Sequence, residues 1–406
     1  MTLDRIKSYL KEYDGPPLRL MEVCGSHTAA IAKSGIPGML NPKITLLSGP
    51  GCPVCVAPSS YIDRLIKLAL TENITVAAFG DLLRVPGSEM SLLEARGRGA
   101  SVKMIYSPFD LIPEAKKDPG RIFVMAAVGF ETTIPVYASF LEEVLAEGLA
   151  NIRLLTALKT MPAVIDRLLT NALPPAKGAL AGNTAVHGGS AADPAAKADP
   201  AFRAARTDPA SASGTAARIE AADIAAAASA PLPIDGILAP GHVSVITGTD
   251  AFRPLAEKHR IPFVAAGFSG PQLLAALYEL VRNAGRGIVV NAYPSAVTEN
   301  GNIAARELTD SYFETADACW RGLGVIPGSG KVLKKEYAHL DMGSARLTED
   351  HQKNSSCICG DVLMGRAVSE DCPLFGRVCT PASPQGACMV SAEGSCFTRY
   401  SVAGGS

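Results

Sequence analysis

Four cysteines near the C-terminus combine a residue type and a spacing that suit metal chemistry. They occupy the frame C-x14-C-x6-C-x16-C within a segment rich in Gly and Pro, at Cys357, Cys372, Cys379 and Cys396. Thiolates select zinc, iron–sulfur clusters or Cu(I), and this frame lacks the two C-x2-C pairs of a usual zinc ribbon. The spacing therefore favours a [4Fe-4S] cluster. A zinc site, or cysteines that are incidental or paired in disulfides, are the alternatives.

A thiol and an imidazole lie close together in the segment MEVCGSHT, residues 21–28. Cys24 and His27 are three residues apart, so their side chains share one face if the segment is helical. Both side chains could then bind one metal, and a thiolate beside a His is also a more reactive nucleophile. The alternative is a buried Cys that packs as a small apolar residue, next to a His that hydrogen bonds satisfy.

A pair of cysteines lies in the segment SGPGCPVC, residues 48–55, directly after the apolar run ITLL. Cys52 and Cys55 form a C-x-x-C motif that can close a disulfide, and the proline between them stiffens the loop. Glutaredoxin-like oxidoreductases carry a similar strand and C-P-x-C, and half of a zinc site is a third interpretation. We expect the next helix to begin at Ser59 or Ser60, so Cys52 would not lie at a helix amino end. This expectation weakens the oxidoreductase interpretation.

Two further polar residues follow apolar runs and are candidates for catalysis. They are Glu131 in the motif GFETT and His242 in the motif PGH. The alternative is that both belong to plain loops, with Thr132 or Thr133 as a helix N-cap. Neither GxxxxGK[ST] nor a well-placed GxGxxG occurs, so the sequence does not indicate nucleotide binding.

Apolar runs and helical patterns alternate along most of the chain. Runs rich in Val and Ile, each followed by a helical pattern, predict βαβ units around parallel sheets. This alternation predicts a first α/β lobe over residues 1–150 and a second over residues 151–290. The motifs GPG, GFETT and APGHV follow predicted strands, and open α/β sheets build their sites at the carboxyl ends of strands. We therefore expect these motifs to converge on one cleft between the lobes.

Two other segments differ from this pattern. Residues 184–233, approximately, are rich in Ala, Ser, Asp and Pro, with few large apolar residues, which predicts a surface insertion that is mobile or partly helical. Residues 291–406 contain the four spaced cysteines and are expected to form a C-terminal cysteine-rich region. Between these segments, one predicted helix has an apolar face formed by Leu273, Leu274, Leu277, Leu280 and Val281.

The composition excludes several classes of protein. The formal net charge of the 406 residues is -1, and no Lys/Arg run occurs, so nucleic acid is not an expected partner. Although 48% of the residues are hydrophobic, no uninterrupted apolar run is long enough to span a bilayer, and the amino end lacks the apolar region of a signal peptide. We therefore expect a cytoplasmic protein without a membrane partner. In that compartment ten cysteines indicate metal-binding or redox groups rather than a structural disulfide framework.

Taken together, the motifs resemble the HypD family of hydrogenase maturation factors. The motifs that carry the resemblance are MEVCGSHT, GPGCPVC, FGDLLRVPGS, GFETT, APGHVSVITG, WRGLGVIPGSG and the C-terminal CICGDVLMG, DCPLFGRVCTP and GACMVSAEGSC. The resemblance covers nearly the whole chain outside the Ala-rich segment. It implies two Rossmann-like lobes with a cysteine-rich cluster region, and an iron–sulfur scaffold that assembles the Fe(CN)2CO part of the [NiFe]-hydrogenase active site. It also implies two partners, the small chaperone HypC and HypE, which delivers cyanide groups.

The resemblance also implies roles for single residues. Cys24 would be the thiolate that binds the iron carrying cyanide and CO, with His27 beside it. Because a protonated ring nitrogen is a good donor, we expect His27 to tune that thiolate or to donate a hydrogen bond to a cyanide nitrogen. Cys52 and Cys55 would be the redox-active pair, the four spaced cysteines would hold the cluster, and Cys319, Cys359 and Cys388 would be structural or auxiliary thiols. Two features depart from the family pattern: the long Ala-rich loop, and a Leu at position 158 where a His is expected. A stand-alone thiol-disulfide oxidoreductase that uses the C-P-V-C pair remains the alternative function.

Overall fold

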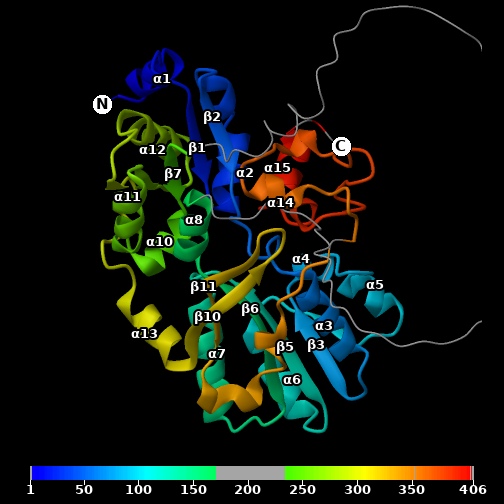
Figure 1. The fold of residues 1–406 in the computed structure, drawn as a ribbon. Helices are drawn as coiled ribbons and strands as arrows, with labels where there is room; N and C mark the ends of the chain where they lie inside the picture. The colour runs from blue at the N-terminus through cyan, green and yellow to red at the C-terminus, as the bar shows by residue number, and fades with distance from the viewer. Residues whose placement is uncertain (1, 171–233, 352, 403, 405–406) are drawn as a thin grey trace, which may run out of the picture. The chain divides into compact units, whose positions relative to one another are not determined.

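The computed structural model describes residues 2–170, 234–351, 353–402 and 404. Residues 1–176 and 231–406 form one compact unit that contains both sheets and the cysteine-rich end. The other unit, residues 177–230, lies outside the described residues, and so does the predicted Ala-rich insertion. All that follows concerns the first unit (Figure 1).

The first sheet has five strands, all parallel, in the order β2-β1-β7-β8-β9. Its central strands are short and buried, as strands covered on both faces must be. The strands are β1 (Leu18–Glu22), β2 (Ile44–Ser48), β7 (Gly236–Ala239), β8 (Phe263–Ala265) and β9 (Val289–Asn291).

The second sheet has six strands in the order β10-β11-β6-β5-β3-β4. The four strands from β6 to β4 are parallel, whereas β10 and β11 form an antiparallel hairpin that pairs antiparallel with β6. The strands are β3 (Ile74–Ala78), β4 (Val102–Met104), β5 (Ile122–Gly129), β6 (Ile152–Lys159), β10 (Phe313–Trp320) and β11 (Gly324–Leu333).

The predicted α/β class with mainly parallel sheets is confirmed, but the sheets do not divide the chain at residues 150 and 290. The first sheet takes its strands from residues 18–48 and 236–291, and the second from residues 74–159 and 313–333. Local apolar periodicity identifies strands, but it does not specify which sheet a strand joins. The hairpin β10–β11 lies in the region expected to be only cysteine-rich. Residues 314–318, in the middle of β10, are all small or polar, and a bulge interrupts the register there, so the strand pattern is weak.

The helices follow the sequence signals closely. Helix α3 begins at Ser59 as predicted, directly after Pro58, and buries its apolar side against the second sheet. Helix α12 begins with a capping box between Ser269 and Gln272, and all five predicted apolar residues are buried. The helices are α1 (Leu3–Lys11), α2 (Gly25–Lys33), α3 (Ser59–Ala69), α4 (Gly80–Leu83), α5 (Leu92–Gly97), α6 (Leu111–Lys117), α7 (Ile134–Ala146), α8 (Met161–Leu169), α10 (Gly241–Thr247), α11 (Arg253–His259), α12 (Gly270–Arg282), α13 (Ile303–Tyr312), α14 (Cys359–Leu363) and α15 (Ser395–Val402).

The cysteine-rich end is built from short elements, and α15 packs against α2 (Figure 1). It has little regular structure of its own besides α14 and α15. Short 3-10 helices complete the described chain: η1 (Ile36–Met39), η2 (Pro108–Asp110), η3 (Asp250–Phe252), η4 (Lys335–Leu340), η5 (Ser344–Arg346), η6 (Ser369–Asp371) and η7 (Ala387–Met389).

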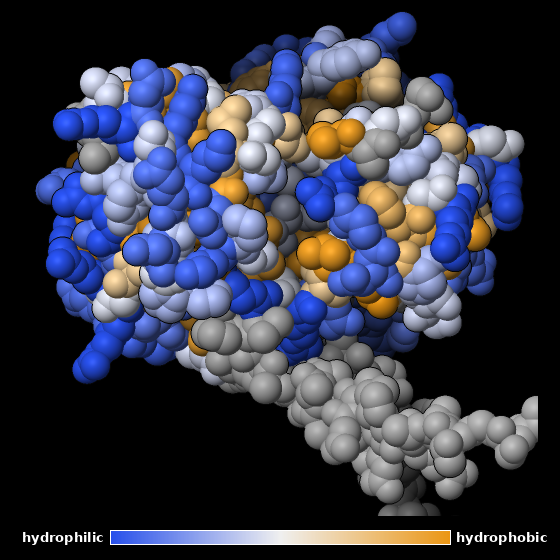
Figure 2. Space-filling model, turned by 90° about the horizontal axis from the view of Figure 1, so that it is seen from above, coloured by the Kyte–Doolittle hydropathy of each residue, from blue (hydrophilic) through white to orange (hydrophobic). Residues whose placement is uncertain are grey.

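Figure 2 shows one face of the molecule, on which hydrophilic residues surround small apolar areas. Of the helices within the described residues, none has both the length and the apolar character needed to cross a membrane.

Candidate functional site

Cys24 lies where β1 ends and α2 begins. It occupies the N-cap position of α2 in an extended conformation, with φ -144° and ψ 117°, and only 7% of its surface is exposed. Burial raises the pKa of its thiol to about 12, and a hydrogen bond from the backbone N–H of His27 opposes that rise. The thiol is therefore neutral without a metal, and binding a metal would release its proton.

The loop after β2 packs directly on Cys24. The backbone N–H of Gly25 donates to the carbonyl of Gly51 at 3.0 Å, and a Cβ on Gly51 would collide with the backbone of Cys24. In this loop Cys52 and Cys55 are joined by a disulfide, with their Cα atoms 5.2 Å apart. Both are buried, at 3% and 0% exposure. The motifs GPGCPVC and CGSH are thus in contact, and GPG lies at a strand end as predicted.

The buried carboxyl of Glu22 supports the start of α2. Its Oε2 accepts a hydrogen bond from the backbone N–H of Cys24 at 3.1 Å, and its Oε1 accepts one from the hydroxyl of Thr28. Burial raises the pKa of Glu22 to about 8, and these hydrogen bonds oppose the rise only in part. At neutral pH the carboxyl of Glu22 is mainly protonated and neutral. No sequence motif indicates Glu22 as part of this site.

His27 faces a carbonyl oxygen, and this contact fixes its tautomer. Its Nε2 lies 3.1 Å from the carbonyl oxygen of Ala266, so Nε2 carries the proton and donates it. Burial lowers the pKa of His27 to about 4, and its Nδ1 is buried without a hydrogen-bond partner. Nδ1 therefore presents a lone pair. The protonated ring nitrogen, which was expected to donate to a cyanide nitrogen, donates to the carbonyl of Ala266 in this structure.

Phe268 connects the two histidines that the sequence singled out. Its ring lies 4.6 Å from the ring of His27 and is stacked on the ring of His242 at 4.1 Å, centroid to centroid. His242 is exposed at the start of α10, just after β7 as predicted. No sequence motif indicates Phe268, because its role depends on the loop after β8.

Glu131 lies after β5 and has a different environment. Its Oε1 accepts a hydrogen bond from the backbone N–H of Met161, the first residue of α8, at 2.8 Å. Its Oε2 is buried without a hydrogen-bond partner, and burial raises its pKa to about 7. It lines a cavity of about 160 Å³ together with Thr160, Thr247 and Arg306. Glu131 thus has a structural contact at α8 and one free carboxyl oxygen.

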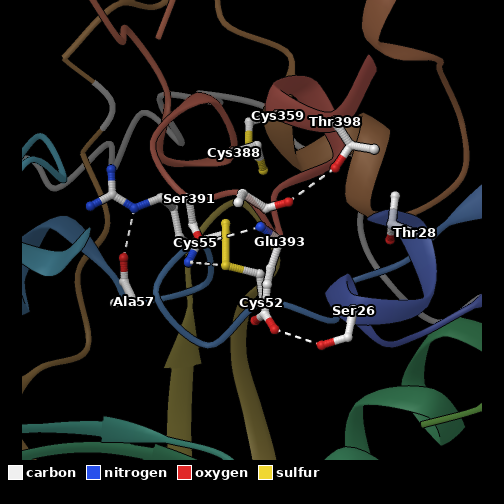
Figure 3. Close-up of a disulfide and its surroundings, with 12 residues drawn as sticks. Ser26, Thr28, Cys52, Cys55, Ala57, Cys359, Cys388, Ser391, Glu393 and Thr398 are labelled. Carbon is white, nitrogen blue, oxygen red and sulfur yellow. Dashed lines mark hydrogen bonds between the residues drawn. A yellow bond between two sulfur atoms is a disulfide. The ribbon is translucent and has the colours of Figure 1, made fainter. Parts of the chain in front are cut away.

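Six cysteines surround one small cavity at the C-terminal end, which we call the cysteine cavity. It contains the four predicted residues and two that were expected to be auxiliary; its cysteines are Cys357, Cys359, Cys372, Cys379, Cys388 and Cys396. The sulfur atoms of Cys359 and Cys388 are 2.6 Å apart. Figure 3 shows this pair near the disulfide of the C-P-V-C motif, and both pairs belong to one buried apolar cluster.

The walls of the cysteine cavity suit buried sulfur. A Cβ on Gly386 would lie 2.7 Å from Sγ of Cys357, so only a glycine leaves that sulfur room. The backbone N–H of Gln385 donates to Sγ of Cys379 at 3.3 Å. The hydrogen bond with Cys359 and burial raise the pKa of Cys357, and the buried guanidinium of Arg321 opposes that rise. The pKa of Cys388 is also raised: its hydrogen bond with Cys359 lowers it, burial raises it, and Arg321 again acts to lower it. Arg321 thus adds positive charge close to the sulfurs.

The C-terminal segment also reaches the site of Cys24. The hydroxyl of Ser26 donates to Oε1 of Glu393 at 2.7 Å (Figure 3), and a Cβ on Gly25 would collide with Glu393. Within the described residues, no three His, Cys, Asp or Glu side chains are arranged to hold a single metal ion. The structure therefore brings together Cys24, the disulfide and the cysteine cavity, and it places Glu131 elsewhere.

Comparisons with known proteins agree with this set of motifs. A family model described as HypD, "Hydrogenase formation hypA family", matches residues 1–190 and 213–403. The chain is 37% identical over 388 residues to the hydrogenase maturation factor HypD of Azotobacter vinelandii, which covers 94% of this chain and 88% of that protein. It is 36% identical over 386 residues to HypD of Rhizobium leguminosarum, and the match covers 94% of this chain and 87% of that protein. It is 33% identical over 406 residues to HypD of Cupriavidus necator, and the match covers 98% of this chain and 93% of that protein. The chain belongs to the HypD family of hydrogenase maturation factors.

Proposed function

We propose that this chain is a scaffold on which the Fe(CN)2CO group of [NiFe]-hydrogenase is assembled. The observation that carries the proposal is the contact between Cys24 and the loop that holds the Cys52–Cys55 disulfide. This contact puts one free thiol beside one redox-capable pair, at the carboxyl ends of two neighbouring strands. Iron that carries CO and cyanide is the substrate, and a thiolate is the soft, electron-donating ligand that it requires.

The groups around Cys24 suit this role. Its thiol must lose a proton to bind iron, and the hydrogen bond from the backbone N–H of His27 stabilises the resulting thiolate. The bare Nδ1 of His27 is a proton acceptor close to the same turn. Glu22 holds the backbone N–H of Cys24 and so fixes the direction in which the residue leaves the strand. His242, stacked on Phe268, adds an exposed imidazole near His27.

The set of cysteines around the cysteine cavity supports a [4Fe-4S] cluster as the cofactor. In such a cluster each thiolate binds a different iron, so four cysteines around one cavity are the arrangement it needs. Cys357, Cys372, Cys379 and Cys396 would hold it, and it would supply one-electron transfer when bound. The N–H donor to Cys379 and the charge of Arg321 are contacts that stabilise thiolates. The close pair Cys359 and Cys388 then lies beside these ligands.

We further propose that Cys52 and Cys55 act as a redox relay during attachment of the cyanide and CO ligands. Opening their disulfide consumes two electrons and two protons and yields two thiols. The pair shares one buried cluster with the cavity cysteines, which favours electron transfer over a short distance. Membership of the family favours partners in hydrogenase maturation, and the proposed ones are HypC, which would share the iron, and HypE, which would deliver cyanide. A cytoplasmic location follows from this role.

The alternative, a stand-alone thiol-disulfide oxidoreductase, has less support. A cysteine that attacks disulfides in other proteins must be reachable from solvent, yet Cys52 and Cys55 are 3% and 0% exposed. Helix α3 begins only at Ser59, so Cys52 does not lie at its amino end. Both features favour a relay inside the protein over exchange with a protein substrate.

Anaerobic purification with the small chaperone tests the proposal. We expect about four iron atoms in the cluster per chain, and infrared bands of iron-bound cyanide and carbonyl. Cys372→Ala should remove the visible absorption of the cluster. Cys52→Ser should keep that absorption but stop hydrogenase maturation. Zinc in place of iron, without visible absorption, would exclude the cluster. Full maturation by Cys52→Ser would exclude the relay.

A further inference from the structure

Lys159, at the end of β6, carries a buried charge. The residue is 2% exposed, and its Nζ donates to the carbonyl oxygen of Cys319 at 2.7 Å. Its Nζ also lies 5.4 Å from the ring centroid of Trp320. An ammonium has three donors, and among the described residues no carboxylate oxygen comes within ion-pair distance of this one. A buried ammonium without a counter-ion is strongly unfavourable. An anion bound beside Lys159 would therefore be stabilising.

A cavity of about 290 Å³ adjoins Lys159 at the edge of β6. It exists because β11 pairs with β6 only through Leu158 and Lys159, and the rest of this edge is covered by the loop around η5. There the backbone N–H of Thr156 donates to the hydroxyl of Ser344 at 2.8 Å. The hydroxyl of Thr156 is itself buried without a hydrogen-bond partner, and Thr156 also lines the cavity. Among the described residues, the cavity therefore borders one hydroxyl without a hydrogen-bond partner and one ammonium without a counter-ion.

The charges around the cavity indicate the ligand class. Lys331 also lines it, but its ammonium already pairs with Oδ1 of Asp310 at 2.9 Å. Asp317 is exposed, so water screens its carboxylate. Asp350 raises the pKa of Lys159, but its oxygens accept backbone N–H groups of other residues, and burial dominates and lowers that pKa to about 8. Most of the Lys159 amine is thus charged at neutral pH, and one positive charge remains to be balanced.

We propose that this cavity binds a small monocarboxylate whose carboxylate pairs with the ammonium of Lys159. A single uncompensated charge suits a monoanion better than phosphate, which carries close to two charges at neutral pH. The site lies between β6, the β10–β11 hairpin and η5, and the proposal does not depend on the role of Cys24 or the cysteine cavity. The proposed carboxylate site lies on a part of the second sheet that has no role in the proposed function.

Calorimetric titration of the full chain with sodium acetate at pH 7 tests the proposal. We expect acetate to bind the wild type, and Lys159→Met to weaken binding by roughly tenfold or more. Lys331→Met is the matched control, because Asp310 already balances that charge, and it should change the affinity by less than about threefold. Acetamide, which has the same shape but no charge, should not bind.

Thermal unfolding provides the second measurement. Acetate should raise the melting temperature of the wild type and of Lys331→Met, but not that of Lys159→Met. Lys159→Met keeps most of the side chain's packing and removes a buried charge, so it should fold. If it does not fold, Lys159→Gln takes its place. Absence of acetate binding to the wild type, equal binding to the Lys159 variant, or tighter binding of inorganic phosphate would each overturn the proposal.

Discussion

At the scale of single residues, Cys24 is the thiol that the site can least replace. It is free, buried and held at the start of α2, whereas the neighbouring thiols are joined in a disulfide. Cys24→Ala should therefore remove the infrared bands of iron-bound cyanide and carbonyl from the complex with the small chaperone, with circular dichroism and visible absorption unchanged. Cys319→Ala, which removes another buried free thiol, is the control and should keep the bands. Bands that persist in Cys24→Ala would place the iron on another residue.

Glu22 gives a prediction about pH at the same scale. Its pKa is about 8 in the folded chain, above its ordinary value of 4.5, because the carboxyl is buried. Between these values the folded state keeps a proton that the unfolded state has lost, so the free energy of unfolding falls as the pH rises from 4.5 to 8. Glu22→Gln should remove this loss in the free energy of unfolding, which is at most about 4 kcal/mol at pH 8. At pH 4.5 the substitution should have little effect on stability.

Urea unfolding of the wild type and of Glu22→Gln at pH 4.5, 6 and 8 measures this difference. Glu131, whose pKa is raised to about 7, should leave a residual slope in the variant. Equal slopes in the two proteins would mean that Glu22 is ionised in the folded chain.

At the scale of elements, the loop before η7 shapes the cysteine cavity. Gly386→Ala would put a methyl group 2.7 Å from Sγ of Cys357, and that sulfur or the loop would have to move. We expect the variant to contain less iron after anaerobic purification, while the two sheets keep their circular dichroism. Gly97→Ala in α5 is the control, because open space surrounds that position. A full iron content in Gly386→Ala would show that Cys357 does not need this position to bind.

The loop after β8 holds both histidines through Phe268. Phe268→Ala should release the rings of His27 and His242, because each contacts this one ring. We expect the cyanide and carbonyl bands to broaden or shift, and nitrogen NMR of His27 to show a mixture of tautomers. Phe268→Tyr keeps the ring and should retain the wild-type spectra. An unchanged tautomer in Phe268→Ala would mean that the carbonyl of Ala266 fixes His27 without help from the ring.

At the scale of the whole molecule, the cysteine-rich end has little core of its own. Its elements are short, and it is attached through α15 on α2, the contact between Ser26 and Glu393, and a buried apolar cluster shared with the disulfide loop. Removing the proposed cluster with a chelator should therefore lower the melting temperature by roughly 5 °C or more, and limited proteolysis should first cleave within residues 353–402. The two sheets should keep their circular dichroism. The chelator should have no further effect on Cys372→Ala, and a large effect there would indicate a second metal site.

The sequence alone determined the local features of this protein. Alternating apolar runs predicted the α/β class, the start of α3 and the buried face of α12. Spacing picked out four of the six cysteines that line one cavity. The motifs GPG, GFETT and APGH lie at the ends of β2, β5 and β7 as expected. These features depend on residues a few positions apart, and helix and strand periodicity act over that range.

Only the tertiary structure decided how these parts meet. It assigned β7 to β9 to the sheet of β1, joined the β10–β11 hairpin to β6, and added Cys359 and Cys388 to the cysteine cavity. It also placed Ser26 on Glu393, 367 residues away, and it fixed the proton of His27 through a carbonyl that is 239 residues away. Burial and hydrogen-bond partners of this kind arise from contacts between distant segments, and they set pKa values and tautomers. Spacing along the chain does not specify them.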